Sequence, residues 1–313
     1  MSAAVRGDFE ISVAPSALQA PALALVLSEI PDERRAAHVE RLLAAARDGE
    51  PDLAGLLIAC QGPALAGAIW ARRQPGRVAT VWPPVVAQPQ WSACAEALAS
   101  EAVAWLARSD VRVAQALVPI AGDEQAAPLR RAGFEHLADL LYMVSLAAEF
   151  PVTPPELALQ FEPVAAGDVA RLASIVEQTY AGTLDCPRLN GVRDINDVLA
   201  GYRACGAAHP APWLVARRDE RDVGCLLLAD HPEENQWEIV YAGLVPVERG
   251  RGHGLALVRR AQWDARQAGR ARLALAVDAA NAPAVKTYDA AGFQTWDRRR
   301  ALVRVFPNGG AAT

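Results

Sequence analysis

The residues most suited to chemistry are the glycines and arginines of one short segment, Arg-Gly-Arg-Gly-His-Gly at 249–254. An apolar run precedes it and predicts a strand that Pro246 ends, and apolar residues at helical spacing follow from Leu255. Glycines let the main chain approach a ligand closely because they carry no Cβ atom. The unpaired N–H groups of a first helical turn favour an anion. A strand, a glycine-rich turn and a helix in this order predict a phosphate-binding site.

The spacing of the glycines narrows the kind of phosphate ligand. The dinucleotide fingerprint G-x-G-x-x-G fails, because its last position counted from Gly250 falls on Leu255. A P-loop would end in Gly-Lys and Ser or Thr, and this segment contains no lysine. The pattern that is present, Arg249-x-x-Gly252-x-Gly254 after an apolar strand, resembles the pyrophosphate-binding motif of the GNAT superfamily of acyl-CoA-dependent N-acyltransferases. For this motif alone, a glycine-rich structural turn is the alternative.

A second segment strengthens the resemblance. Leu-Ala-Leu-Ala-Val at 273–277 predicts a short strand, and Ala284 and Tyr288 then lie one helical turn apart. Gly292 is placed to end this helix and Phe293 to begin a strand. The segment, which includes Asn281, is similar to the superfamily's second CoA motif, at the expected distance behind the first.

Composition bounds the class of protein. A chain of 313 residues, 52% hydrophobic and 21% charged, is typical of two globular domains. The net charge of −5 argues against nucleic acid or an anionic membrane surface as a partner, so we expect neither. No leader and no apolar stretch of eighteen residues is evident, which also argues against a membrane-spanning segment. Five scattered cysteines without C-x-x-C pairs predict reduced thiols in a cytoplasmic protein. The five histidines lack metal-ligand spacing, so we expect no metal.

The chain contains an internal repeat. Gly133 and Gly292 are 159 positions apart, and so are Phe134 and Phe293, each pair within an Ala-Gly-Phe triplet. A proline-rich stretch at 149–156 predicts a linker between two copies of one unit. We therefore expect a first domain at 1–148 and a second at 157–313. Coincidence in an alanine-rich chain is the alternative.

The resemblance implies a fold class for both domains. It is α/β (α+β), with two tandem GNAT-like domains, each a mixed, largely antiparallel twisted sheet flanked by helices.

The repeat also shows which motif residues the first copy lacks. The motif positions Arg249, Gly252, Gly254, Tyr288, Asn281 and Glu238 align with Gln90, Ala93, Ala95, Leu129, Gly122 and Ala79. The first domain is therefore expected to be degenerate and structural, although residual ligand binding stays open, and the second to be catalytic.

The resemblance also implies a co-substrate, acetyl-CoA, and the residues that hold it. Pantetheine would pair with the main chain of the strand before the glycine-rich turn, and the N–H of Leu244 would polarise the thioester carbonyl. We also expect Asn281 to cap its helix. The expected cofactor-binding residues are Ala242, Gly243, Leu244, Arg249, Gly250, Arg251, Gly252, His253, Gly254, Leu255, Asn281 and Tyr288. For Arg249 and Arg251 a solvated loop is the alternative.

Two side chains are candidates for proton transfer. Alternation places Glu238 on the strand face of Val240 and Ala242, and it resembles the strand glutamate that many family members use as general base. Tyr288 lies at the family's general-acid position, where it would return a proton to the departing thiolate. An exposed strand carboxylate and a packed aromatic ring are the respective alternatives.

The acceptor is the least defined part of the prediction. In this fold the segment between the first two helices, 179–194 here, covers the acceptor site, and its Asp185, Asn190 and Arg193 could bind a small polar amine or simply cap turns. We expect N-acetylation of a small-molecule amine by direct attack in a ternary complex, in a monomer or homodimer. One alternative is a mycothiol-synthase-like activity, which the segment His-Pro-Glu-Glu-Asn-Gln-Trp at 231–237 puts in doubt because it lacks the expected Trp-Thr-Lys. The other is an acyl-CoA-binding module without turnover.

Overall fold

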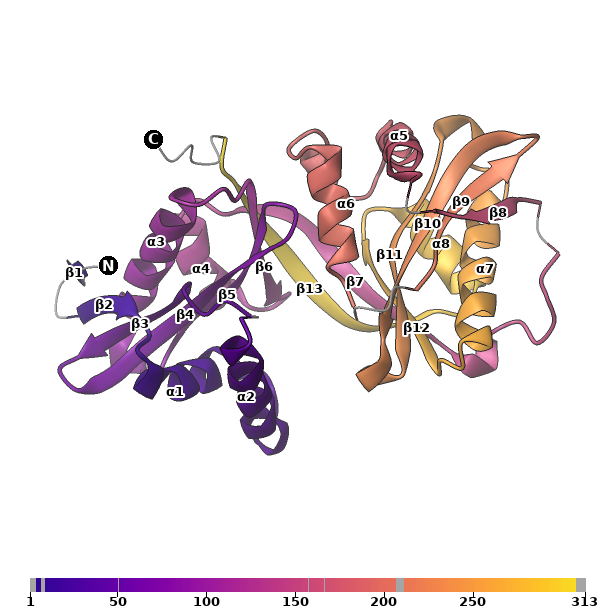
Figure 1. Ribbon diagram of the computed structural model, residues 1–313. Coiled ribbons are helices and arrows are strands. Elements are labelled where there is room, and N and C mark those ends of the chain that lie inside the picture. The colour runs from indigo at the N-terminus through magenta and orange to yellow at the C-terminus, as the bar shows by residue number, and fades with distance from the viewer. Residues whose placement is uncertain are drawn as a thin grey trace. The chain divides into compact units, whose positions relative to one another are not determined.

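The structure is a computed structural model (Figure 1), and it describes residues 4–6, 9–49, 51–156, 158–165, 167–206 and 211–307. Its contacts form two compact units. The first comprises Met1–Leu137 with Arg300–Thr313, and the second comprises Ala138–Arg299.

The first unit is a twisted sheet with helices on both faces. Its strands follow the order β1-β2-β3-β4-β5-β6-β13. Alternate residues of β3 enter different cores, because Leu57 packs with α3 and α4 whereas Leu56 packs with α1 and α2. The elements are β1 (Ala4–Arg6), β2 (Phe9–Val13), α1 (Ser16–Val26), α2 (Asp32–Arg47), β3 (Leu56–Gln61), β4 (Ala64–Gln74), β5 (Val78–Val86), η1 (Pro89–Trp91), α3 (Ala93–Ala107), β6 (Val113–Pro119), α4 (Asp123–Arg131) and the end of β13 (Gln294–Val305).

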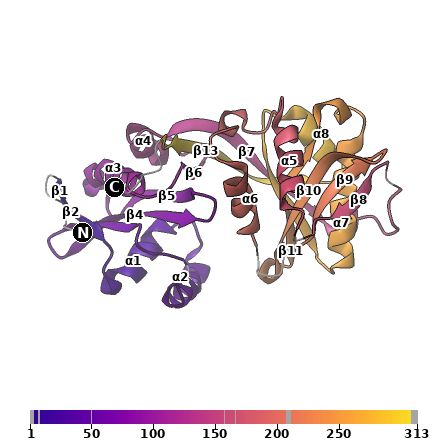
Figure 2. The same cartoon turned by 45° about the horizontal axis from the view of Figure 1, so that its top comes forward.

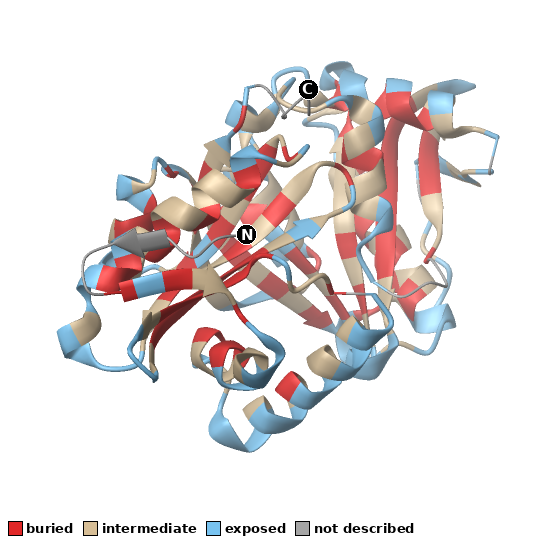
Figure 3. Cartoon of the chain, turned by 60° about the vertical axis from the view of Figure 1, so that its left-hand side comes forward, coloured by how far each residue is buried: buried red, intermediate tan, exposed pale blue. Residues whose placement is uncertain are grey.

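The second unit repeats this plan with the strand order β7-β12-β11-β10-β9-β8. Figures 1 and 2 show α5 and α6 on one face of the sheet and α7 on the other. Buried residues run along the central strands, as the red segments of Figure 3 show. The elements are β7 (Glu135–Leu146), η2 (Ala147–Glu149), β8 (Gln160–Pro163), α5 (Val169–Tyr180), η3 (Pro187–Leu189), α6 (Ile195–Arg203), β9 (Trp213–Arg218), β10 (Arg221–His231), η4 (Pro232–Glu234), β11 (Gln236–Leu244), η5 (Pro246–Glu248), α7 (His253–Gln267), β12 (Arg272–Asp278) and α8 (Ala282–Ala290).

The repeat predicted from the sequence recurs in the structure. Gly122 and Asn281, 159 positions apart, are the N-cap residues of α4 and α8. Gly133 and Gly292 follow these helices with φ of +85° and +81°, a left-handed conformation that favours glycine. Two copies of one α/β unit with mixed, largely antiparallel sheets are thereby confirmed.

Each unit takes a strand from the other half of the sequence. β7, from the first half, pairs antiparallel with β12 of the second half from Arg272↔Leu146 to Asp278↔Leu140. In return, the end of β13 belongs to the first unit. The proline-rich stretch after β7 is also anchored, since Phe150 is buried in the core of the second unit. The units therefore divide at other points than the expected boundaries at 148 and 157.

One register differs from the constant offset of 159. Thr80 pairs with Gln115 and Glu238 pairs with Ala274, so β5 and β11 correspond at an offset of 158 while the next strands keep 159. The residue equivalent to Glu238 is therefore Thr80, and the predicted equivalence with Ala79 is wrong by one position. At the same offset Pro84 corresponds to Ala242.

The strand exchange predicts which fragments fold. A chain of residues 157–313 lacks β7 and leaves the edge of β12 bare, together with the core residues Leu141 and Met143. We expect this fragment to be insoluble or to melt without cooperativity, whereas residues 138–299 should give a cooperative transition by circular dichroism. Cooperative melting of 157–313 with the same midpoint as 138–299 would contradict the exchange.

Candidate active site

The central feature of the second unit is a gap between two neighbouring parallel strands. β11 and β12 pair only at Gln236↔Arg272, Trp237↔Leu273 and Glu238↔Ala274. Both strands continue beyond these pairs, to Leu244 and Asp278, without further pairing to each other. The strand that precedes the glycine-rich turn is thus free along one edge, as the resemblance implies.

The main-chain donors of β11 point into this gap. The N–H of Val245 donates to the Val223 carbonyl over 2.9 Å, so Val245 faces β10. Antiparallel residues alternate between bonding the partner strand and facing away from it. The N–H groups of Ala242 and Leu244 therefore lie on the side away from β10, where an added extended ligand could accept from them.

The glycine-rich turn at 249–254 is open and left-handed. Gly250 and Gly252 have φ of +72° and +82°, and a Cβ atom on either would meet no atom within 4 Å. Packing therefore does not require glycine at these positions, but the conformation does. Gly252 is the N-cap of α7 and provides no side-chain cap for the first helical N–H groups. The turn thus presents bare main-chain donors, which suit an anion.

The charged side chains of the turn act in different ways. The Arg249 guanidinium donates to the carbonyls of Leu244, Gly182 and Thr179 over 3.0, 3.0 and 2.7 Å, so it ties the end of α5 to β11. Arg251 is exposed. The His253 side chain is only 8% exposed, and its Nδ1 lies 3.1 Å from Glu248 Oε2 without hydrogen-bond alignment. Charge at the turn therefore comes from Arg251, while Arg249 serves as a brace.

Helix α8 carries the candidate acid. Asn281 accepts from the N–H of Ala284 over 3.3 Å, which confirms the predicted cap. Tyr288 is half-buried, and its ring lies 5.7 Å from that of Phe293. Burial, and secondarily the charge of Asp185, raise the pKa of the Tyr288 phenol. The hydroxyl is thereby kept protonated and able to donate.

The segment between α5 and α6 brings Asp185 to this helix. Its Oδ1 accepts from the N–H of Asp278 over 3.0 Å, and the N–H of Cys186 donates back to Asp278 Oδ2 over 3.4 Å. Burial, and secondarily the charge of Asp278, raise the pKa of Asp185. Asp278 was not among the predicted residues. The only feature of the sequence that could have indicated Asp278 is its position directly after an apolar run that predicts a strand.

The other two predicted acceptor residues, Asn190 and Arg193, both interact with Tyr180 at the end of α5. Asn190 Nδ2 donates to the Tyr180 carbonyl over 3.3 Å, so it closes the turn of its own segment. The positive charge of Arg193 acts to lower the pKa of the Tyr180 hydroxyl, against the larger effect of burial, which raises it. Tyr180 in turn lies 3.3 Å, hydroxyl to hydroxyl, from Tyr202.

A β-bulge decides which face Glu238 occupies. Leu228 pairs with Ile239 and Leu227 with Tyr241, which leaves Val240 as the extra residue. Glu238 therefore shares a face with Tyr241, and the prediction that it shares a face with Ala242 is wrong. Simple alternation could not show this, because one inserted residue reverses every position after it.

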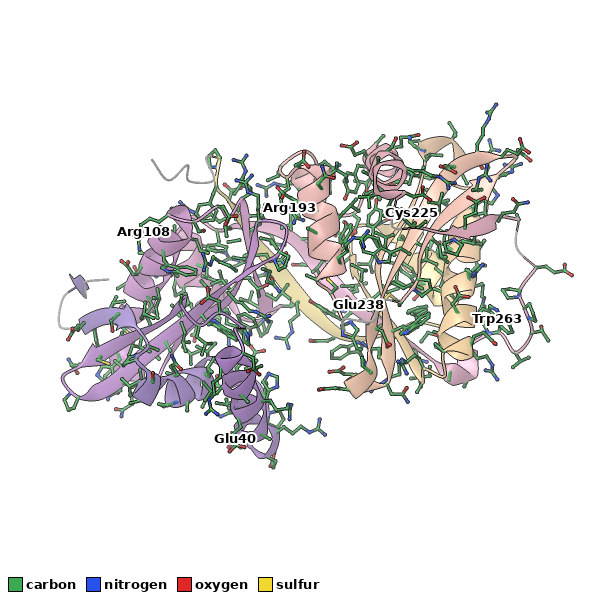
Figure 4. All side chains as sticks on the ribbon, in the orientation of Figure 1. Glu40, Arg108, Arg193, Cys225, Glu238 and Trp263 are labelled. Atoms are coloured by element: carbon green, nitrogen blue, oxygen red, sulfur yellow. The ribbon has the colours of Figure 1, made fainter. Side chains whose placement is uncertain are left out.

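Glu238 has a partner that sequence reasoning missed. Its Oε2 lies 2.8 Å from His231 Nε2 at the end of β10, and the two side chains are 34% and 26% exposed. Figure 4 marks Glu238 on β11. The hydrogen bond to Glu238 raises the pKa of His231, and the charges of Glu234 and Asp230 act in the same direction. A histidine directly before Pro-Glu-Glu was the only signal available in the sequence.

A tyrosine cluster covers the same face beside the gap. The Tyr241 hydroxyl lies 2.8 Å from Thr179 Oγ1, and the Tyr241 ring lies 5.7 Å from Tyr180 and 5.5 Å from Tyr202. A Cβ atom on Gly243 would come within 2.7 Å of Thr179 Oγ1, so glycine is required there by close approach. Trp237 is buried in the core of the unit, on the opposite face.

Comparison with known proteins agrees with this geometry. Residues 181–293 match the model of the acetyltransferase (GNAT) family. Curated proteins give no match to the sequence. The second unit thus carries a segment that matches the acetyltransferase (GNAT) family, and the two halves of the chain are built on the same fold.

Solved structures share the fold over the whole chain. A GCN5-related N-acetyltransferase from Sphaerobacter thermophilus has a TM-score of 0.63 at 18% identity, with 98% of each chain covered. A tandem GNAT protein from the clavulanic acid biosynthesis pathway has a TM-score of 0.54 at 14% identity, covering 97% of this chain and 100% of its own. A putative acetyltransferase from Pyrococcus horikoshii has a TM-score of 0.55 at 12% identity, covering 98% and 93%. At these identities the likeness concerns the fold.

Two further features were sought in the described ranges. Among those residues, no helix is both long and apolar enough to cross a membrane. Nor do three or more His, Cys, Asp or Glu side chains in them gather as a metal would require.

The His231–Glu238 pair predicts a pH-dependent stability. Because the folded pKa of His231 is raised, its stabilisation is complete below the unfolded pKa and is lost as pH rises through the folded pKa. His231→Gln should therefore lower the free energy of unfolding more at pH 5.5 than at pH 8.5, measured by denaturant titration. His38 is the control of opposite sign, since burial and Arg41 lower its pKa. An equal loss for His231→Gln at both pH values would contradict the pairing.

Proposed function

We propose that the chain transfers an acetyl group from acetyl-CoA to the amine of a small molecule. The observation that carries this proposal is the free edge of β11, whose Ala242 and Leu244 N–H groups face a gap that leads to the glycine-rich turn. An extended pantetheine can pair with that edge while the diphosphate meets the first turn of α7. Gly250, Arg251, Gly252, His253, Gly254 and Leu255 would hold the diphosphate through their main chain.

The reaction would proceed by direct attack. The amine nitrogen attacks the thioester carbonyl, the C–N bond forms, and the C–S bond breaks. The N–H of Leu244 would stabilise the oxyanion, and Tyr288 would give its proton to the departing thiolate. Glu238, through water, would take the proton that the ammonium must lose before attack. Asp185, near Tyr288, would attract the cationic acceptor, with Asn190 and Arg193 shaping its loop.

The first half would serve as a structural domain without its own co-substrate. The N-cap of its α3 is Ser92 with φ of −54°, directly after the short helix η1, so no left-handed glycine turn precedes this helix. Pro84, which corresponds to Ala242, has no N–H to offer a ligand. One of the two strand donors and the glycine-rich turn are thus both replaced in the first half.

Turnover tests the catalytic assignment. The purified chain should release free thiol from acetyl-CoA in the presence of some member of a panel of small amines. Tyr288→Phe should lower kcat by about 10²-fold and Glu238→Gln by a similar factor, because each removes a proton-transfer group. Tyr202→Phe, which removes a hydroxyl that contacts Tyr180, is the control and should leave kcat within about twofold.

Other results would revise the proposal. An unchanged rate in either variant removes that residue from the mechanism. Acetyl-CoA binding without thiol release for any amine would instead favour a binding module.

Two matched glycines test the binding site separately. Gly252 and Gly269 lie at opposite ends of α7 with φ of +82° and +69°, and neither would place a Cβ atom within 4 Å of another atom. Alanine at either should cost about 1–2 kcal/mol of stability. Only Gly252→Ala should weaken acetyl-CoA binding, by about tenfold or more in a calorimetric titration. Equal affinities in the two variants would place the diphosphate elsewhere.

A further inference from the structure

The pairing of β11 with β12 and of β12 with β7 places Tyr142 of β7 close to the point where β11 and β12 separate. Glu238 on β11 pairs with Ala274 on β12, and two residues further along β12 Ala276 pairs with Tyr142 on β7. Paired residues and residues two apart on a strand share a sheet face. Glu238, Ala274, Ala276 and Tyr142 therefore project from the same face of the second unit, with Ala276 placed where β11 has already left β12.

On this face β12 carries short side chains, and the neighbouring strands β11 and β7 carry longer ones. Ala276 is exposed and Ala274 is half-buried, so β12 forms a floor of methyl groups. Adjacent strands lie about 4.8 Å apart, which places β7 and β11 about 10 Å apart across that floor. Glu238 with His231 stands on the β11 side, and Tyr142 stands on the β7 side.

The β7 wall is aromatic. The Tyr142 and Trp296 rings meet edge to face, with centroids 6.0 Å apart and an interplanar angle of 65°. Trp296 is 64% exposed, which is unusual for so large an apolar side chain beside a candidate active site. Burial raises the pKa of Tyr142 to about 12; the charge of Arg299 opposes this shift, and the charges of Glu238 and Asp297 add to it.

We infer that Tyr142 and Trp296 form the specificity wall of the acceptor site, and that the acceptor is a primary amine carrying an aromatic ring. The ammonium would approach Glu238, and the ring would stack against the Tyr142–Trp296 pair above Ala274 and Ala276. An aromatic ring matches these groups because the floor and the wall are largely apolar, whereas sugar hydroxyls would be desolvated there without partners. This inference rests on the proposed function for the identity of the reacting amine.

The inference also gives the first half a direct part in recognition. Tyr142 belongs to the strand that the first half contributes to the second unit, and Trp296 belongs to the strand that leaves the second unit for the first. The strand exchange would thus bring the aromatic wall to the acceptor site. A chain with only one copy of this unit has no second copy to contribute a strand, so its own last strands would have to provide the aromatic side chains.

Calorimetric binding to the full chain, with and without coenzyme A, tests this without relying on turnover. The probes are 2-phenylethylamine and n-octylamine, which match in carbon number. The wild type should bind the aromatic amine at least about fivefold more tightly, and Tyr142→Leu and Trp296→Leu should each abolish that preference. Tyr142→Phe, which keeps the ring, should retain it. Melting curves of the variants would show that they are folded.

Several results would overturn the inference. They are equal or weaker binding of the aromatic amine by the wild type, tighter binding of glucosamine, or a preference that survives both leucine substitutions. Failure of the proposed function shows itself differently, as absent thiol release from acetyl-CoA while the binding preference for the aromatic amine persists.

Discussion

The structure of the second unit depends on one departure from regular sheet pairing. β11 and β12 begin as paired parallel strands and then separate, which leaves main-chain N–H groups of β11 facing a gap. Unsatisfied main-chain donors are costly when they are removed from water, at about 1–3 kcal/mol each, so the gap favours an occupant that can accept from them. An extended ligand satisfies this edge as another strand would. The same strand then ends at the glycine-rich turn, so one continuous run of main chain faces both parts of the ligand.

The neighbouring residues maintain this arrangement. The bulge at Val240 turns Tyr241 and Gly243 towards α5, where Thr179 contacts both, and Arg249 ties the end of α5 to the carbonyl of Leu244. The end of β11 is thus braced by side chains on one side while its other edge stays open. Asp185 accepts from the N–H of Asp278 at the end of β12, and its charge contributes to the raised pKa of Tyr288. In the first unit the strands β5 and β6 separate after only three pairs as well, but Pro84 lacks the N–H that Ala242 offers, and no glycine turn precedes α3.

Much of this could be predicted from local chemistry. The helix after the glycine-rich turn, the Asn281 cap and the end of α8 at Gly292 follow from short-range rules of backbone conformation, and the structure confirms each. The tandem repeat followed from the two Ala-Gly-Phe triplets. The catalytic roles of Tyr288 and Glu238 stay predictions, because geometry places these side chains without showing a reaction.

The missed features are non-local. A bulge inserts one residue without a compositional mark, so the face of Glu238 could not be derived from alternation. Which sheet a strand joins depends on the whole topology, so neither the exchange of β7 and β13 nor the place of Tyr142 could be read from an internal repeat. Likewise, His231 and Asp278 become relevant only through partners that lie far along the chain or across a hairpin.

The central claim is that a bare main chain at the start of α7 binds a diphosphate. The most direct measurement is a calorimetric titration of the full chain with coenzyme A and, separately, with pantetheine, which lacks the diphosphate and nucleotide. The account predicts that coenzyme A binds at one site per chain and that pantetheine binds at least about a hundredfold more weakly, because it loses every contact with that turn. Equal affinity for the two ligands, or no binding of coenzyme A, would contradict it.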